Sequence, residues 1–121
     1  MEQLQHTILQ AWDNRSLLQQ PEYQNAIEQV LELLDKGMLR VAEPSDAGWV
    51  VNEWVKKAVI LYFPIRKMEV TEAGPLEFHD KIPLKSNYTD LGVRVIPPAV
   101  ARYGSFLSKG VILMPGYVNI G

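Results

Sequence analysis

The stretch GSFLSKGVILMPGYVNIG, residues 104–121, decides the fold expected for the last part of this chain. Glycine recurs in it every six residues, at Gly104, Gly110 and Gly116. Large apolar residues recur with the same spacing, at Val100, Phe106, Ile112 and Val118. A helix repeats every 3.6 residues or so and a strand every two, so this period fits neither. It indicates a left-handed parallel β-helix, in which those apolar residues point inward and a glycine lies near each corner.

A β-helix of this kind has three flat sides per coil, so the repeat supplies little more than one coil. Because a coil buries its interior and pairs its backbone only against neighbouring coils, we expect the edges of a single coil to be open. The sequence therefore predicts two parts. Residues 1–92 form an N-terminal helical domain, and residues 93–121 form the first coil of a truncated β-helix.

Hydrophobic periodicity predicts the elements of the first part. We expect helices over residues 2–13 and 22–36, the second one preceded by Pro21 and stopped by Gly37. Residues 39–51 indicate a β-hairpin. A third helix follows over residues 53–63, with Asn52 as N-cap and Pro64 as its end, and its apolar residues predict that it is the most buried helix. Residues 65–87 are expected to be irregular, with one or two short strands.

The predicted fold class is thus a small α-rich (α+β) domain with a β-hairpin, followed by the start of a left-handed parallel β-helix built from hexapeptide repeats. At 121 residues with 47% hydrophobic residues, the chain can bury a core. It has no cysteine, which excludes disulfides and thiolate metal sites and suits a cytoplasmic location. No uninterrupted apolar run approaches the roughly 18 residues that a membrane span needs, so no membrane association is expected.

Charge is distributed unevenly along the chain. The net charge is −2, yet residues 91–121 contain Arg94, Arg102 and Lys109 and no acidic residue. A cationic, acid-free segment suits an anionic ligand. The alternative is that short repeat strands simply hold few charges. Three cations are too few for the phosphate contacts that bind nucleic acid, so a nucleic-acid partner is not expected.

Chemistry-bearing residues are sparse. His6 and His79 have no second histidine at metal-ligand spacing, so no metal site is predicted. Ser105 and Ser108 have no neighbouring histidine or acid that would make either a nucleophile. We therefore predict no catalytic residue and no bound cofactor in this chain.

Five blocks of the sequence resemble the tetrahydrodipicolinate N-succinyltransferase family of bacterial lysine biosynthesis. They are residues 33–43 (LLDKGMLRVAE), 54–59 (WVKKAV), 81–85 (KIPLK), 93–98 (VRVIPP) and 113–121 (LMPGYVNIG). The resemblance implies a small helical N-terminal domain followed by a long left-handed β-helix. It also implies a homotrimer in the full-length protein.

The same resemblance implies transfer of a succinyl group from succinyl-CoA, a co-substrate, to the amine of the ring-opened dicarboxylate substrate in the diaminopimelate route. The family's acidic catalytic residues and most of its CoA groove lie in coils beyond residue 121, so the chain alone is expected to be inactive. Two alternatives stay open. One is a non-catalytic interaction or structural protein that retains only the N-terminal domain, and the other is a different hexapeptide enzyme, such as an acetyltransferase acting on the same substrate.

Arg94, just before the paired prolines, matches the family's arginine that binds the dicarboxylate substrate. A guanidinium offers two parallel donors that fit a carboxylate, which agrees with this role. The alternative is that Arg94 pairs with an acidic residue of the N-terminal domain. Arg102 is a second candidate of the same kind. Phe106 departs from the hexapeptide pattern, since it is bulkier than the usual inward aliphatic residue.

Overall fold

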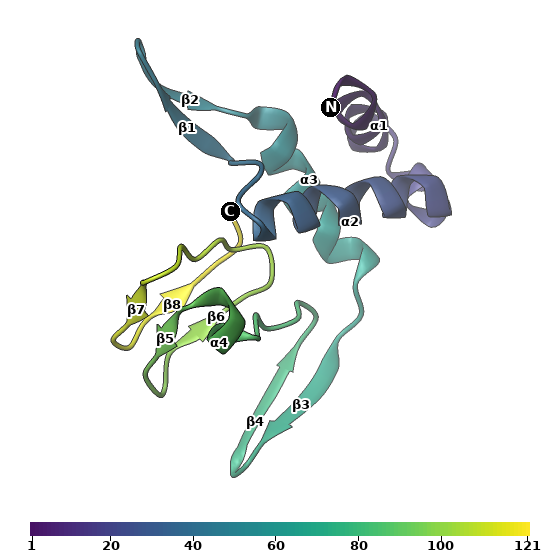
Figure 1. The fold of residues 1–121 in the computed structure, drawn as a ribbon. Coiled ribbons are helices and arrows are strands. Elements are labelled where there is room, and N and C mark those ends of the chain that lie inside the picture. Colours follow the sequence, from purple (N-terminus) through teal and green to yellow (C-terminus); the bar gives the residue numbers. More distant parts are fainter.

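Helices form the first part of the chain in the computed structural model, which describes all 121 residues (Figure 1). They are α1 (Glu2–Asp13), the 3-10 helix η1 (Arg15–Gln19), α2 (Pro21–Asp35) and α3 (Glu53–Ile65). The three predicted α-helices are therefore confirmed. Pro21 occupies the first turn of α2, where its missing N–H costs nothing. Pro64 does not end α3, since the helix continues for one residue beyond it.

The main hydrophobic core lies between α1, α2 and α3. Its fully buried side chains include Ile8 of α1, Ile27 and Leu31 of α2, and Leu61 of α3. The expectation that the third helix is the most buried is wrong, because α2 buries six residues and α3 buries four. α1 and α2 do not cover every apolar side chain of α3, and Ile60 is exposed.

Two antiparallel hairpins project from the helices (Figure 1). The predicted hairpin is confirmed as β1 (Ala42–Ser45) and β2 (Gly48–Val51). A second hairpin, β3 (Glu69–Ala73) and β4 (Leu76–Asp80), occupies the region expected to be irregular. Its two-residue loop begins with Gly74 at a φ of +61°, a conformation that glycine adopts readily. This region is thus more regular than the sequence predicted.

The last part of the chain makes two parallel strand pairs. A short helix, α4 (Tyr88–Leu91), precedes four two-residue strands: β5 (Arg94–Val95), β6 (Val100–Ala101), β7 (Ile112–Leu113) and β8 (Tyr117–Val118). β5 pairs with β7 and β6 pairs with β8. Arg94 lies beside Ile112, 18 positions later, whereas Val100 lies beside Tyr117, 17 positions later. Parallel neighbours at this spacing mean that the chain completes one turn and begins to stack on itself.

The sequence predicted that Val100, Phe106, Ile112 and Val118 point into the coil, and this is wrong for three of these four residues. Ala101 is 1% exposed and Leu107 7%, whereas Phe106 is 52% and Ile112 47% exposed. Val100 also lies outside the small apolar cluster, whereas Val118, as predicted, packs against it. Successive strand residues face opposite sides, so an error of one residue in phase exchanges the inner and outer faces. The connection from β7 to β8 is one residue shorter than that from β5 to β6, so Val118 faces the apolar cluster.

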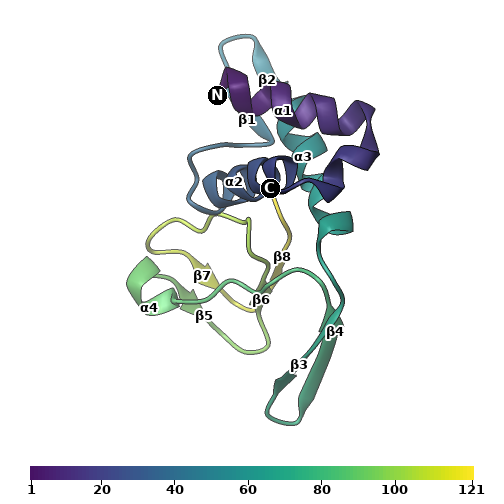
Figure 2. The ribbon, with the colours of Figure 1, turned by 90° about the vertical axis from the view of Figure 1, so that its right-hand side faces the viewer.

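The starting edge of the turn is covered by the chain itself. Residues 83–85 run antiparallel to residues 101–103, with Lys85 N–H donating to Ala101 O and Tyr103 N–H to Pro83 O, both at 2.9 Å. α4 adds Tyr88 and Leu91 to the apolar cluster. Figure 2 shows α1, α2 and α3 on one side of β5–β8, and β3–β4 extending away from them.

Candidate functional site

Arg94 presents an exposed guanidinium on the outer face of β5. Its backbone N–H donates to Val111 O at 3.0 Å, which fixes the strand beside β7. Its side chain takes part in none of the chain's ion pairs, so the pairing with an N-terminal acid that sequence reasoning left open is not formed. Two-pronged donation to a carboxylate is therefore available to this side chain.

A second cation lies near the start of β5. The Lys109 side chain passes directly over Gly92, where an added Cβ would come within 2.8 Å of the Lys109 Cγ. Gly110 N–H donates to Gly92 O at 2.8 Å, which holds this approach. Gly92 also has a φ of +70°, so both its conformation and its missing side chain are needed here. Lys109 thus adds a second cation near the start of β5.

Arg102 differs from Arg94, because its guanidinium is already bound within the chain. Its Nη2 lies 2.8 Å from Asp80 Oδ2, its Nη1 donates to Asn119 Oδ1 at 3.3 Å, and its Cζ lies 5.6 Å from the centre of the Phe63 ring. Burial alone would raise the pKa of Asp80, but hydrogen bonds from the Lys81 backbone and from Arg102 outweigh it and leave this pKa below its usual value. Arg102 therefore ties β4 and α3 to the coil.

A partly buried ion pair joins α2 to the coil. Lys85 Nζ lies 2.7 Å from Asp35 Oδ1 and also donates to Asp35 O at 3.2 Å. The same Oδ1 accepts the backbone N–H of Gly104 at 2.9 Å. Gly104 has a φ of +97°, and a Cβ there would meet Leu31 at 2.9 Å. The end of α2 thus holds this corner of the coil in place.

Tyr103 adds a second link between the coil and α2. Its hydroxyl donates to the Glu32 carboxylate, which also pairs with Lys36 at 2.8 Å. Hydrogen bonds from Lys36 and then Tyr103 lower the pKa of Glu32. Burial, and then the Glu32 carboxylate, raise the pKa of Tyr103. Sequence reasoning missed Asp35, Lys85 and this tyrosine, because their partners lie 50 or more residues away.

The Ser105 hydroxyl has a partner within the chain. Ser105 is buried and its hydroxyl donates to Arg102 O at 2.7 Å, so this side chain stabilises the backbone of the turn. The structure contains no group of three or more His, Asp or Glu side chains that could hold a metal ion. None of its helices combines the length and the apolar character that crossing a membrane requires. The cytoplasmic location stays a prediction.

Comparison with known proteins identifies the family of this chain. Residues 3–65, which cover α2, α3, the first hairpin and all but the first residue of α1, match the family model described as "Tetrahydrodipicolinate N-succinyltransferase N-terminal". The chain belongs to the tetrahydrodipicolinate N-succinyltransferase family. The resemblance stated from the sequence blocks is confirmed.

Curated relatives in this family match almost the whole chain. A 2,3,4,5-tetrahydropyridine-2,6-dicarboxylate N-succinyltransferase of Bordetella petrii is 48% identical over 98% of this chain. Enzymes with the same name from Paracidovorax citrulli and Azoarcus sp. are 50% and 48% identical over 99% and 100% of it. The aligned region is 47–48% of each relative, so the chain spans about half the length of these succinyltransferases. Arg94 and Arg102 lie outside residues 3–65 but within the part of the chain that these relatives cover.

Proposed function

We propose that this chain is the N-terminal half of a 2,3,4,5-tetrahydropyridine-2,6-dicarboxylate N-succinyltransferase. One observation carries the proposal: relatives with that name are 48–50% identical to nearly the whole chain. The proposed reaction moves a succinyl group from succinyl-CoA to the substrate amine. The nitrogen attacks the thioester carbonyl, the C–S bond breaks, CoA leaves as the thiolate, and a carboxylate general base accepts the proton of the amine.

In this proposal Arg94 binds one carboxylate of the dicarboxylate substrate. Its exposed guanidinium, its lack of an ion pair and the Lys109 side chain over Gly92 support the role. Arg102 stays a second predicted contact, although a substrate carboxylate would have to replace or share Asp80 there. No residue of this chain is proposed as the general base, and we propose that the chain alone has no turnover.

We further propose that residues 93–121 begin a left-handed parallel β-helix and that residues 1–92 form the N-terminal helical domain. Parallel pairs spaced by 17 and 18 residues support the first part, because three six-residue sides make 18. Exposed apolar side chains on the outer faces, Ile112 and Met114, support association of full-length chains into a trimer.

Restoring the second half of the protein tests this function. Residues 1–121 would be joined to the remaining residues of the Bordetella petrii relative, and release of CoA thiol from succinyl-CoA would be measured with and without tetrahydrodipicolinate. We expect substrate-dependent release by the joined protein and none by residues 1–121. No release by a folded, joined protein would contradict the proposal and favour a non-catalytic interaction role.

A further inference from the structure

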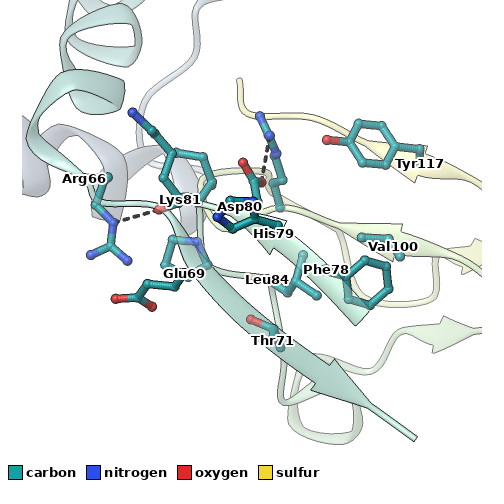
Figure 3. A pocket seen from close by; sticks show the side chains of 13 residues that line it. Arg66, Glu69, Thr71, Phe78, His79, Asp80, Lys81, Leu84, Val100 and Tyr117 are labelled. Carbon is teal, nitrogen blue, oxygen red and sulfur yellow. Dashed lines mark hydrogen bonds and ion pairs between the residues drawn. The ribbon is translucent and has the colours of Figure 1, made fainter. Parts of the chain in front are cut away.

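A cleft of about 510 Å³ lies between the second hairpin and the coil (Figure 3). Thr71 and Phe78 are cross-strand partners, so they share the hairpin face that forms one wall. Val100 and Tyr117 are neighbours on the outer face of β6 and β8 and form the opposite wall. Leu84 lines the space between the two walls. The volume is within the range of roughly 300–1,000 Å³ that is typical of small-molecule sites.

One guanidinium at the edge of this cleft is oriented but only partly used. Arg66 donates through Nε to Lys81 O at 2.9 Å, and its Cζ lies 5.8 Å from the centre of the Tyr62 ring. These contacts fix the plane of the guanidinium. Its two terminal nitrogens have no hydrogen-bond partner within the chain, and in Figure 3 they point toward the side where the Glu69 carboxylate lies. Such a group can donate two parallel hydrogen bonds to one carboxylate.

The other charged groups of the cleft leave this site net positive. Arg102 and Asp80 pair with each other. Lys81 Nζ donates to Phe63 O, a neutral acceptor, at 3.2 Å and takes part in no ion pair. Glu69 is the remaining carboxylate and takes part in no ion pair, so it opposes an incoming anion.

The walls of the cleft favour an apolar body. Phe78, Leu84 and Tyr117 are large apolar or aromatic side chains that are exposed here, and a flat apolar group between them would remove that surface from water. We propose that this cleft binds a small organic carboxylate, with its carboxylate on Arg66 and its apolar body against Phe78 and Leu84. The proposal does not depend on the role proposed for Arg94, which does not line the cleft, whereas Arg102, the second predicted substrate contact, lines it and is already paired with Asp80.

A titration of the ¹⁵N-labelled chain followed by NMR tests this binding. The probe is 3-phenylpropionate, and 3-phenylpropanamide is the matched neutral compound. We expect the acid to shift the amide signals of Thr71, Phe78, Leu84 and Val100 and to bind at least about tenfold more tightly than the amide, since a charge-assisted pair is lost in the amide. Equal affinities, or shifts confined to other parts of the chain, would overturn the proposal.

Charge variants locate the carboxylate. Arg66→Gln should abolish the preference for the acid, whereas Arg40→Gln, which removes an equal charge outside the cleft, should keep it. Glu69→Gln should tighten binding of the acid a few-fold, because it removes the opposing carboxylate. An unchanged affinity in Arg66→Gln would overturn the assignment. If Arg66→Gln loses its native spectrum, Glu69→Gln decides alone: tighter binding supports the site, and unchanged binding refutes it.

Discussion

Replacing Lys85 by methionine should show how strongly the helical part holds the coil. Methionine keeps the length and apolar volume of the lysine stem but removes the ammonium that contacts Asp35 at 2.7 Å. The Lys85 side chain is 5% exposed and the Asp35 side chain 19%. Breaking a buried ion pair costs about 3–5 kcal/mol, but Asp35 keeps its hydrogen bond from Gly104 and reaches some water. We therefore expect a loss of about 2–4 kcal/mol in the free energy of unfolding.

The ion pair between Lys36 and Glu32, four residues apart, offers a matched control. Lys36→Met makes the same chemical change in a pair whose side chains are 62% and 46% exposed. Exposed pairs of this kind contribute at most about 1 kcal/mol, so this variant should remain close to the parent. Urea unfolding followed by far-UV circular dichroism measures both. In thermal melts the Lys85 variant should unfold roughly 10 °C or more below the parent.

A double-mutant cycle identifies the cause of the loss. Asp35→Asn alone leaves the Lys85 ammonium unpaired. In the double variant both charges are gone, and the amide oxygen of the substituted side chain can still accept the N–H of Gly104. The double variant should therefore be less destabilised than the sum of the single variants, by about 1.5 kcal/mol or more. Equal losses in Lys85→Met and Lys36→Met, or additive single effects, would refute the reasoning.

Two further predictions concern Tyr103 and the glycines. Because the pKa of Tyr103 is raised on folding, the protonated hydroxyl stabilises the folded state below pH ~10, and this stabilisation is lost as the pH rises further. In urea unfolding at rising pH, the free energy of unfolding should therefore fall more steeply for the parent than for Tyr103→Phe. Parallel curves for the two proteins would contradict this. Gly37→Ala should lower the free energy of unfolding by about 1–2 kcal/mol from its φ of +72° alone, and further because the new Cβ would lie 2.7 Å from the Phe106 ring. Gly116 has open space around it and no positive φ, so Gly116→Ala should change the stability little. Similar melting temperatures for the two variants would refute this.

Local patterns are sufficient to predict the three long helices, although not η1 or α4. In α2 the apolar residues Tyr23, Ile27, Val30, Leu31 and Leu34 recur at helical spacing between Pro21 and Gly37, and they form the buried face. The second hairpin is harder to predict, because its strands contain several glutamates and show weak alternation. The dipeptide Gly74–Pro75 is the available signal, since glycine in the first place of a two-residue loop suits a hairpin turn.

The phase of the coil could not be predicted from periodicity. Two sets of apolar residues share the six-residue period: one begins at Val95 and Ala101, and the other at Val100 and Phe106. The larger residues of the second set favour it as the inward one, but Phe106 lies outside against Gly37. Contacts between distant segments decide the phase. The same holds at the candidate site: Arg94 could be named from its local motif, whereas the link between Asp35 and Lys85, 50 residues apart, could not.

The most direct test of the central claim is the affinity of Arg94→Lys for the dicarboxylate substrate, measured in the joined full-length protein. Lysine keeps the charge but loses the two-pronged geometry, so we expect substrate affinity to fall about ten- to a hundredfold. Affinity for succinyl-CoA and the melting temperature should change little, because Arg94 is exposed and takes part in no ion pair. A lower melting temperature with unchanged substrate affinity would show that Arg94 is a structural residue and would contradict the proposed role.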